Sequence, residues 1–295
     1  MRPDASVTPM RTVNAISIDT REAAQRDANL VAPRCAVVLA GRRNADDPLA
    51  DEAGATHRAL LDIDGAPMLL RVVRCLLARP GLDRVVINID APELLDAIPE
   101  IVDLRERGAI EIVRSTDSPS RSVLESLEHA GLDRAPVLVT TADHALLDDP
   151  MLDAFLEASA HVAADLTVAL VPSRAIRARF PEAKRTYLRF RDEAYSGANL
   201  FLFRRPEARQ AALFWRRVES ERKRPWRIAR AFGWTNLLLF LLRRLDLDTA
   251  LERASRVVGA RVAAIPLEIA EAAVDVDKIE DLVLVRRILD ERRAD

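Results

Sequence analysis

The sequence predicts an α/β fold in which a mostly parallel sheet lies between two layers of helices. A continuous run of aliphatic residues over 36–39 and largely aliphatic segments over 84–90 and 136–143 are typical of strands that are buried on both faces. Helical patterns separate these runs, and strands that are joined through helices form βαβ units with parallel pairing. These two observations predict a three-layer α/β/α sheet.

The remaining elements follow in chain order. Pro67 opens a helix over 67–78, and a second helix is predicted over 92–107. Serine caps and a closing glycine predict a helix over 118–131. Further strands are predicted over 109–114, 165–171, 186–192 and 198–204, and a further helix over 150–159.

The first strand leads into a segment that is suited to binding phosphate. Gly41 follows the strand, and the missing Cβ lets backbone N–H groups approach an anion. Arg42, Arg43 and Arg58 supply cationic donors. The alternative is that Ala40 and Gly41 form a plain turn and that the arginines are solvated.

A carboxylate stands at the end of the predicted strand over 136–143, just beyond its buried residues and at the same edge of the sheet. Asp143 is suited to Mg²⁺, which prefers hard oxygen ligands and is usually held by carboxylates together with substrate phosphates. The alternative role for Asp143 is to cap the following turn. His144 is expected to position its neighbours, because histidine prefers softer metals.

Composition excludes several classes of function. A net charge of −2 argues against binding of nucleic acid through bulk electrostatics. No apolar run approaches the roughly 20 residues that span a bilayer, so membrane contact is expected to be peripheral at most. Two cysteines in apolar segments indicate a reducing compartment, and we expect a cytoplasmic protein. A nicotinamide dehydrogenase is disfavoured, because no G-x-G-x-x-G follows the first strand.

Two segments, LAGRRN over 39–44 and HRALLDIDGAPMLLRVVRCL over 57–76, resemble the MobA-like nucleotidyltransferases. That family is similar to molybdopterin-guanine dinucleotide guanylyltransferase. Its pattern has Leu-Ala-Gly-Gly followed by Arg, and then Lys-Ala-Leu-Leu-x-Ile-x-Gly-x-Pro-Met-Leu. Arg42 replaces the second glycine here, and Arg58 replaces the lysine. The resemblance implies the glycosyltransferase-A-like fold of nucleotide-diphospho-sugar transferases, with Mg²⁺ as cofactor.

The resemblance also implies roles for individual residues. Arg42, Arg58 and Asp143 are implied to be catalytic, with Asp143 and Asp275 as the metal ligands. The residues implied to contact the nucleotide are Leu39, Ala40, Gly41, Asn88, Ser118 and Ser120. The residues implied on the acceptor side are Ser196, Gly197 and Asn199, for which a plain hairpin turn is the alternative.

Asp275 belongs to the segment over 272–289, which resembles the family's closing Asp-x-Asp-Thr-Pro-Glu-Asp-Leu motif. In the family, a short strand leads an acidic residue into the site before the last helix. Asp277 is expected to cap that helix, with Glu280 three residues later in a capping box.

The expected domain organisation is a tail over 1–33 and one nucleotidyltransferase domain over 34–295, with a helical insertion or subdomain over 205–259. The insertion contains Trp215, Trp226 and Trp234. We expect these tryptophans to form its core. The alternative is an aromatic face that binds an acidic or lipid-linked acceptor, or a membrane surface.

These features predict an enzyme that transfers a nucleotide from CTP or GTP to a small phosphorylated or phosphonate acceptor and releases pyrophosphate. No nucleic-acid partner is expected, and the enzyme can form a homodimer. Two alternatives stay open. A glycosyltransferase that uses a nucleotide sugar shares the fold, although the basic loop favours a free triphosphate. A non-catalytic regulatory protein would explain the departures at Arg42 and Arg58, whereas the carboxylates of Asp143 and Asp275 favour catalysis.

Overall fold

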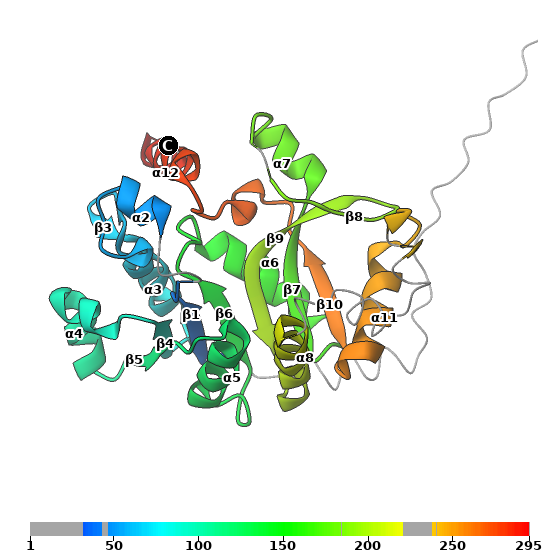
Figure 1. The fold of residues 1–295 in the computed structure, drawn as a ribbon, viewed down its shortest axis with the longest axis horizontal. Coiled ribbons are helices and arrows are strands. Elements are labelled where there is room, and N and C mark those ends of the chain that lie inside the picture. The colour runs from blue at the N-terminus through cyan, green and yellow to red at the C-terminus, as the bar shows by residue number, and fades with distance from the viewer. Residues whose placement is uncertain (1–31, 43–46, 184, 221–237, 240, 295) are drawn as a thin grey trace, which may run out of the picture.

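The central sheet contains eight strands (Figure 1). The computed structural model describes residues 32–42, 47–183, 185–220, 238–239 and 241–294. The strands of the sheet are β1 (Cys35–Leu39), β4 (Arg84–Ile89), β5 (Ile110–Arg114), β6 (Val137–Thr141), β7 (Leu166–Pro172), β8 (Leu188–Arg189), β9 (Ala194–Phe203) and β10 (Val262–Pro266).

The sheet is mostly parallel, as the sequence predicts. Its order is β10-β7-β9-β6-β1-β4-β5, and β8 pairs with β9. β1 runs parallel to β4 and β6, β4 to β5, and β7 to β10, whereas β9 runs antiparallel to β6, β7 and β8. The carboxyl ends of the parallel strands therefore meet at one edge, where the N-terminal half of β9 also lies.

Helices and short turns connect the strands and cover the sheet (Figure 1). The helices are α2 (Pro48–Glu52), α3 (Met68–Ala78), α4 (Pro99–Glu106), α5 (Pro119–Ala130), α6 (Asp149–Ala160), α7 (Ser173–Arg179), α8 (Arg209–Ser220), α11 (Leu247–Val258) and α12 (Ile279–Ala294). The 3₁₀ turns are η1 (Arg58–Leu60), η2 (Pro92–Ala97), η3 (Pro206–Ala208) and η4 (Ala270–Ala273), and a separate ribbon pairs β2 (Asp62–Ile63) with β3 (Ala66–Pro67).

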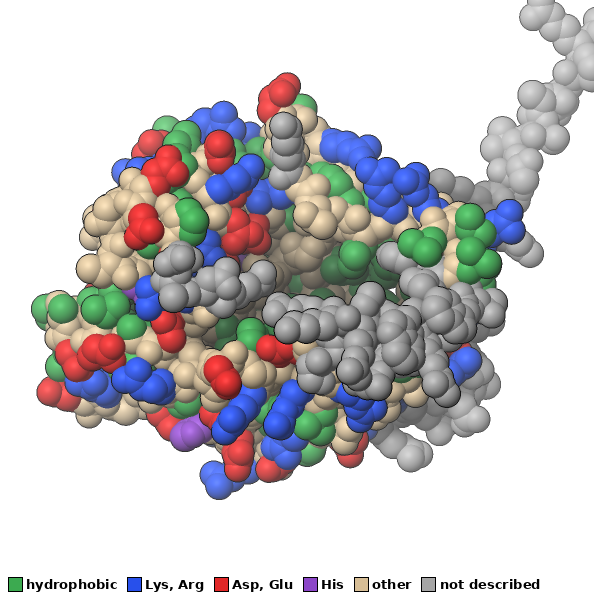
Figure 2. All heavy atoms as spheres, viewed as in Figure 1, with side chains coloured by type: hydrophobic (Ala, Val, Ile, Leu, Met, Phe, Trp, Pro, Cys, Tyr) green, Lys and Arg blue, Asp and Glu red, His purple; other side chains and the backbone are tan. Residues whose placement is uncertain are grey.

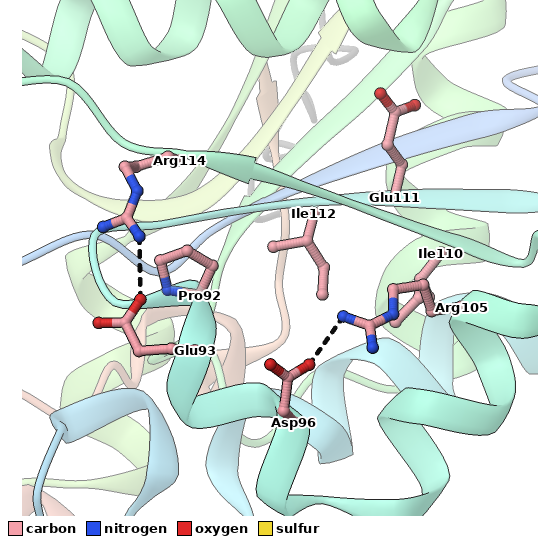
Figure 3. Close-up of a pocket in the computed structure, with 8 residues that line it drawn as sticks. All are labelled: Pro92, Glu93, Asp96, Arg105, Ile110, Glu111, Ile112 and Arg114. Atoms are coloured by element: carbon pink, nitrogen blue, oxygen red, sulfur yellow. Dashed lines mark hydrogen bonds and ion pairs between the residues drawn. The ribbon is translucent and has the colours of Figure 1, made fainter.

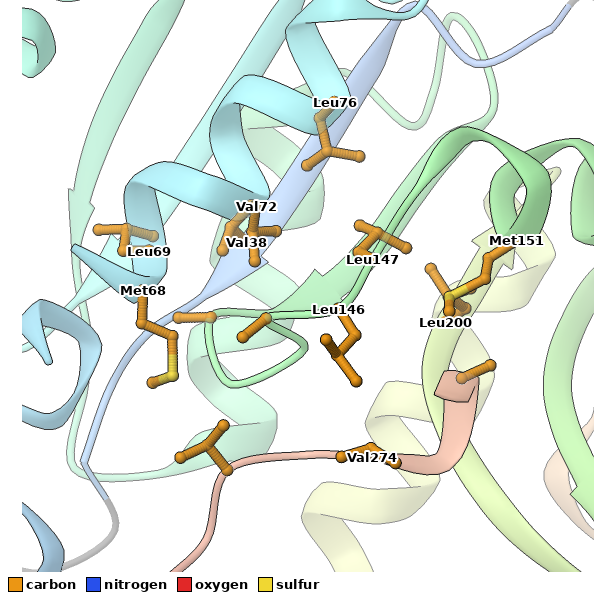
Figure 4. Close-up of a cluster of buried hydrophobic side chains, with 14 of the residues drawn as sticks. Val38, Met68, Leu69, Val72, Leu76, Leu146, Leu147, Met151, Leu200 and Val274 are labelled. Carbon is orange, nitrogen blue, oxygen red and sulfur yellow. The ribbon is translucent and has the colours of Figure 1, made fainter. Parts of the chain in front are cut away.

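Alternate residues of the central strands face two separate apolar clusters. Ala36 and Val38 of β1 belong to the first cluster, and Cys35 and Val37 belong to the second. Residues of α3, α6 and α12 join the first cluster, part of which is shown in Figure 4. Residues of α5 and α8 join the second. Because both faces of the sheet are covered, the three-layer arrangement is confirmed.

The helix predicted over 92–107 is interrupted. The chain forms η2 and then α4, and Ile98 between them is extended, with φ −107° and ψ 102°. Pro99 is responsible, because it has no N–H to donate and its ring disfavours a helical conformation at the preceding residue.

The hairpin turn that was the alternative for residues 195–199 is wrong, because these residues lie within β9. The chain reverses earlier, where the Phe190 N–H donates to the Glu193 carbonyl at 2.9 Å. A shift of register between β7 and β9 falls between Val168 and Leu170, and Asn199 on β9 adopts a left-handed φ of 48°. A bulge therefore shapes this part of the sheet edge.

The predicted helical insertion is described only in part. Trp226, Trp234 and most of the tail over 1–33 lie outside the described residues. Trp215 on α8 is 44% exposed, so it is not the core residue that the sequence predicts. The helix instead buries Ala212 in the apolar cluster that it shares with α5. Within the described ranges, no helix has both the length and the apolar character of a membrane span.

Candidate active site

Two predicted metal ligands come together at the carboxyl edge of the sheet. Asp143 follows β6, and Asp275 follows β10 and η4. The two segments are in contact, because the Val276 N–H donates to the Asp143 carbonyl at 3.1 Å. The short strand implied directly before Asp275 is wrong, since residues 270–273 form a 3₁₀ turn. Figure 2 shows that this face of the molecule is hollowed near its middle, with acidic and basic side chains along the edge toward α12.

Burial and neighbouring carboxylates raise the pKa of both Asp143 and Asp275. The pKa of Asp143 is raised to about 6: burial raises it most, the charges of Asp275 and Asp277 also raise it, and a hydrogen bond from Thr141 opposes the shift. Burial and the charge of Asp277 also raise the pKa of Asp275, while Arg185 opposes that shift. A divalent cation would relieve this repulsion, so the donor set fits Mg²⁺.

The protein can supply only part of a coordination shell here. In the described part of the chain, no group of three or more His, Cys, Asp or Glu side chains could hold a metal ion. Asp275 also uses its Oδ1 to bind Arg185 Nη1 at 2.9 Å. Mg²⁺ commonly binds to one or two carboxylates and completes its shell with substrate phosphates and water, which matches this pair.

Arg58 lies beside the carboxylates. Its Nε lies 3.3 Å from Asp47 Oδ2, and its Nη2 lies 3.6 Å from Asp277 Oδ1. The same Nη2 donates to the carbonyls of Val276 and Asp277 at 3.4 and 3.3 Å. Asp277 thus faces Arg58, and its own N–H donates to Asp281 Oδ2 at 3.3 Å. At the start of α12, the Asp277 N–H is therefore accepted by the carboxylate of Asp281, not by that of Glu280 as predicted.

Gly41 lies against Ser115, the residue that follows β5. A Cβ added at Gly41 would lie 2.6 Å from Ser115 Oγ, which donates to Asn88 Oδ1 at 2.6 Å. Asn88 is buried, and its Nδ2 has no hydrogen-bond partner among the described residues. The structure thus places Asn88 beneath the loop, and Gly41 is exposed at the loop surface.

Replacement of Gly41 by Ala is expected to reduce the free energy of unfolding by about 1–3 kcal/mol, because the added methyl group must displace the Ser115 side chain. Urea unfolding measures this change. Ser115→Ala in the same chain should recover part of the loss. Gly197→Ala serves as control, since no atom lies within 4 Å of its added Cβ and its φ is not left-handed. Equal effects at the two glycines would contradict the steric explanation.

Arg42 is held by a carboxylate that the sequence analysis missed. Its backbone N–H donates to Asp90 Oδ1 at 3.0 Å, and its Nε donates to Asp90 Oδ2 at 2.9 Å. The buried His57 contacts Asp90 Oδ1 through Nε2 at 3.0 Å. Burial raises the pKa of Asp90, but the hydrogen bonds from His57 and Arg42 outweigh it and lower the pKa to about 2.

Ser118 and Ser120 lie at the N-terminus of α5, where Ser118 caps the helix as predicted. Both hydroxyl groups donate to Glu219 Oε2 of α8, at 3.1 and 2.6 Å, and the Ser120 N–H donates to the same oxygen at 3.3 Å. The donors predicted to contact a nucleotide therefore bind a carboxylate of the protein itself.

The predicted acceptor residues lie on β9, at the same edge. Ser196 and Gly197 pair with Val171 and Leu170 near the carboxyl end of β7. Ser196 is buried, whereas Gly197 is exposed and Asn199 is half-buried. Gly197 and Asn199 are thus the accessible members of this group.

Arg185 is a second residue that sequence reasoning missed. Besides Asp275, it binds Asp281 Oδ1 through Nη2 at 3.0 Å, and its side chain is only 8% exposed. No sequence signal marks Arg185, because it lies in a long connection between α7 and β8. Asp90 could have been found, since it follows a strand just as Asp143 does.

A cavity of about 490 Å³ lies at the edge strand β5 (Figure 3), and its lining residue Arg114 donates to the Asp90 carbonyl at 2.8 Å. It is lined by residues of η2, α4 and β5, and two ion pairs, Arg114–Glu93 and Arg105–Asp96, cross it. The fifth charged residue of the lining, Glu111, pairs with Arg84 and His129 outside the cavity.

Comparisons with known proteins agree with this arrangement. Residues 36–218 match the family model of the MobA-like NTP transferase domain. A hypothetical transferase from Thermus thermophilus is 34% identical, with a TM-score of 0.69 over 85% of this chain and 100% of that one. No curated protein sequence matches the chain.

Two further solved structures share the fold. A CMP:2-keto-3-deoxy-manno-octonic acid synthetase complexed with CTP is 14% identical, with a TM-score of 0.52 over 88% of this chain and 99% of that one. The bifunctional IspDF from Campylobacter jejuni is also 14% identical, with a TM-score of 0.51 over 84% of this chain and 53% of that one. On the evidence of the family match, the chain belongs to the MobA-like NTP transferase family and is an enzyme of the nucleotidyltransferase type.

Proposed function

We propose that the protein transfers a nucleoside monophosphate from CTP or GTP to a small phosphorylated or phosphonate acceptor, with Mg²⁺ as cofactor and pyrophosphate as the second product. The observation that carries the proposal is the meeting of Asp143, Asp275 and Arg58 at the carboxyl edge of the sheet. Ligands of open α/β sheets bind at this edge. The family favours a free triphosphate over a nucleotide sugar as donor.

In the proposed reaction, an oxygen of the acceptor attacks the α-phosphorus. The new P–O bond forms as the bond between the α-phosphorus and the bridging oxygen breaks, and pyrophosphate leaves with the bonding electrons. Bound Mg²⁺, held by Asp143 and Asp275, would neutralise negative charge on the phosphates. Arg42 and Arg58 would bind and orient the triphosphate, and the bare backbone at Gly41 would let it approach. Catalysis would rest on positioning and electrostatics, without a side-chain nucleophile.

Asn199 and Gly197 are the proposed contacts to the acceptor, because they are accessible on β9 at the same edge. Ser118 and Ser120 are proposed to contact the nucleotide in place of Glu219. The single domain over 34–295, the cytoplasmic location and the homodimer stay predictions of the sequence.

CTP or GTP, with Mg²⁺ present, is expected to raise the melting temperature more than the other two nucleoside triphosphates. A ligand at 100 times its Kd adds about 2.7 kcal/mol to the stability of the folded state, which corresponds to several degrees. Differential scanning fluorimetry with all four triphosphates, with and without a chelator, measures the shift. Pyrophosphate release with phosphorylated acceptors then tests turnover. Absence of a shift with every triphosphate would overturn the proposal.

A further inference from the structure

We propose that Asp90 is a positioning residue, which holds Arg42 and the Gly41 loop in the geometry that binds the triphosphate. The proposal rests on the nucleotidyl transfer proposed above and concerns a residue to which neither the sequence motifs nor the family match gives a role. Asp90 directly follows β4, and the neighbouring strand β1 leads into Gly41 and Arg42. The Ala40 N–H donates to the Asn88 carbonyl at 2.7 Å, which keeps the two strand ends together.

Asp90 binds Arg42 at two points. One oxygen accepts the backbone N–H and the other accepts Nε, so a single carboxylate fixes both the peptide and the side chain of Arg42. Among the described residues, no other group hydrogen-bonds to this guanidinium. Its two Nη atoms can therefore both donate hydrogen bonds to one phosphate while Nε stays bound to Asp90.

His57 extends the contact to the second cationic segment. Its Nδ1 accepts the Ala59 N–H at 3.1 Å, so Nδ1 carries no proton and the Nε2–H donates to Asp90. His57 is the N-cap of η1, whose first residue is Arg58. One carboxylate thus connects the Arg42 loop to the segment that carries Arg58.

The arrangement compensates for the departure from the family's double glycine. An arginine at the second glycine position adds a long side chain with many rotamers to a loop that needs a defined geometry. The Asp90 carboxylate removes this freedom before the ligand arrives, which reduces the entropy lost on binding. Asp90 stays ionised at neutral pH, because the hydrogen bonds from His57 and Arg42 lower its pKa to about 2.

Asp90→Asn is expected to raise the KM for the triphosphate about tenfold, because the amide NH₂ cannot accept from Arg42 Nε. The amide carbonyl can still accept the Arg42 N–H and the His57 Nε2–H, so folding is retained. Asp83→Asn is the matched control, since Asp83 also pairs with an arginine, Arg34, at an exposed site before β4. The control should leave the KM unchanged.

A double-mutant cycle separates positioning from a general structural effect. If Asp90 acts through Arg42, then Asp90→Asn should not raise the KM further in an Arg42→Ala background. An equal tenfold rise in both backgrounds would overturn the proposal, as would an unchanged KM in the single variant.

Amide hydrogen exchange at Arg42 tests the same contact without nucleotide. In Asp90→Ala the exchange of this amide should accelerate at least tenfold relative to the wild type, whereas Asp83→Ala should leave it unchanged. Unchanged exchange in Asp90→Ala would overturn the positioning role. If the wild-type protein binds no triphosphate, the proposed function fails, and this measurement still decides whether Asp90 holds the loop.

Discussion

Asp143→Asn is expected to lower kcat by about three orders of magnitude. Stabilisation of transition-state charge by a bound metal contributes several kcal/mol, and about 4 kcal/mol corresponds to a factor of 10³. The amide carbonyl can still accept the hydrogen bond from Thr141, but it carries no charge to hold the cation. Pyrophosphate release at saturating triphosphate and Mg²⁺ measures the loss.

The same substitution is expected to stabilise the folded protein at neutral and alkaline pH. The pKa of Asp143 is raised from 3.8 to about 6, chiefly by burial, so the protonated carboxyl contributes stability that is complete below pH 3.8 and is lost as the pH rises through 6. The neutral amide avoids this loss, which amounts to about 2–3 kcal/mol at pH 8.

Asp153→Asn is the matched control for both measurements. Asp153 is exposed on α6 and pairs with Arg79 at 2.6 Å, so its replacement should leave both kcat and stability nearly unchanged. A variant at Asp143 that keeps its activity, or that unfolds more readily at pH 8 than the wild type, would contradict the assigned role.

The fold could be predicted because most of its strands are short, largely aliphatic segments that helical patterns separate. Val37 and Val38 face opposite sides of the sheet, and helices cover both sides. For this reason β1 is apolar throughout and does not alternate between apolar and polar residues, which identifies it as a central strand. The boundaries were less predictable. Pro99 divides a helix whose apolar pattern continues across it, and β9 runs through the Gly197 segment that resembled a turn.

The candidate site was predictable where a charged residue lies just beyond the end of a strand, as Asp143 does. The partners of these charges were not predictable, because they come from distant parts of the chain. Arg185 reaches Asp275 across 90 residues, and Arg58 reaches the Asp277 carbonyl across 219. Such contacts depend on how loops pack against each other, which a local pattern does not encode.

Several groups that are proposed to bind the nucleotide already form ion pairs or hydrogen bonds with carboxylates of the protein. Arg42 binds Asp90, Arg58 binds Asp47 and Asp277, and the two serines of α5 bind Glu219. Asp277 differs from Asp90 and Asp47 in its exposure, because 61% of its side chain is accessible. A phosphate can replace an exposed partner at little cost, since water already solvates that carboxylate. Arg58 is therefore the arginine best placed to exchange Asp277 for the triphosphate.

Arg58→Ala is expected to raise the KM for the triphosphate by about 10–100-fold, which is the range of one charge-assisted hydrogen bond. It should also shift the acidic limb of the pH–rate profile upward, because the charge of Arg58 lowers the pKa of Asp143 and would be lost. Steady-state kinetics from pH 5 to pH 9 would measure both changes.

Arg58→Lys separates charge from shape. The lysine restores the residue of the family pattern and keeps the positive charge near Asp143, so the pH profile should return to that of the wild type. Its compact ammonium cannot contact Asp47 and Asp277 at once as the guanidinium does. Any remaining rise in KM therefore measures what the planar, forked shape of the guanidinium contributes to triphosphate binding. Arg79→Ala, which removes an arginine from the Asp153 pair at the end of α3, should change neither quantity. If Arg58→Ala leaves both the KM and the pH profile unchanged, Arg58 does not contact the triphosphate, and its ion pairs serve only to hold η1 against the segment that precedes α12.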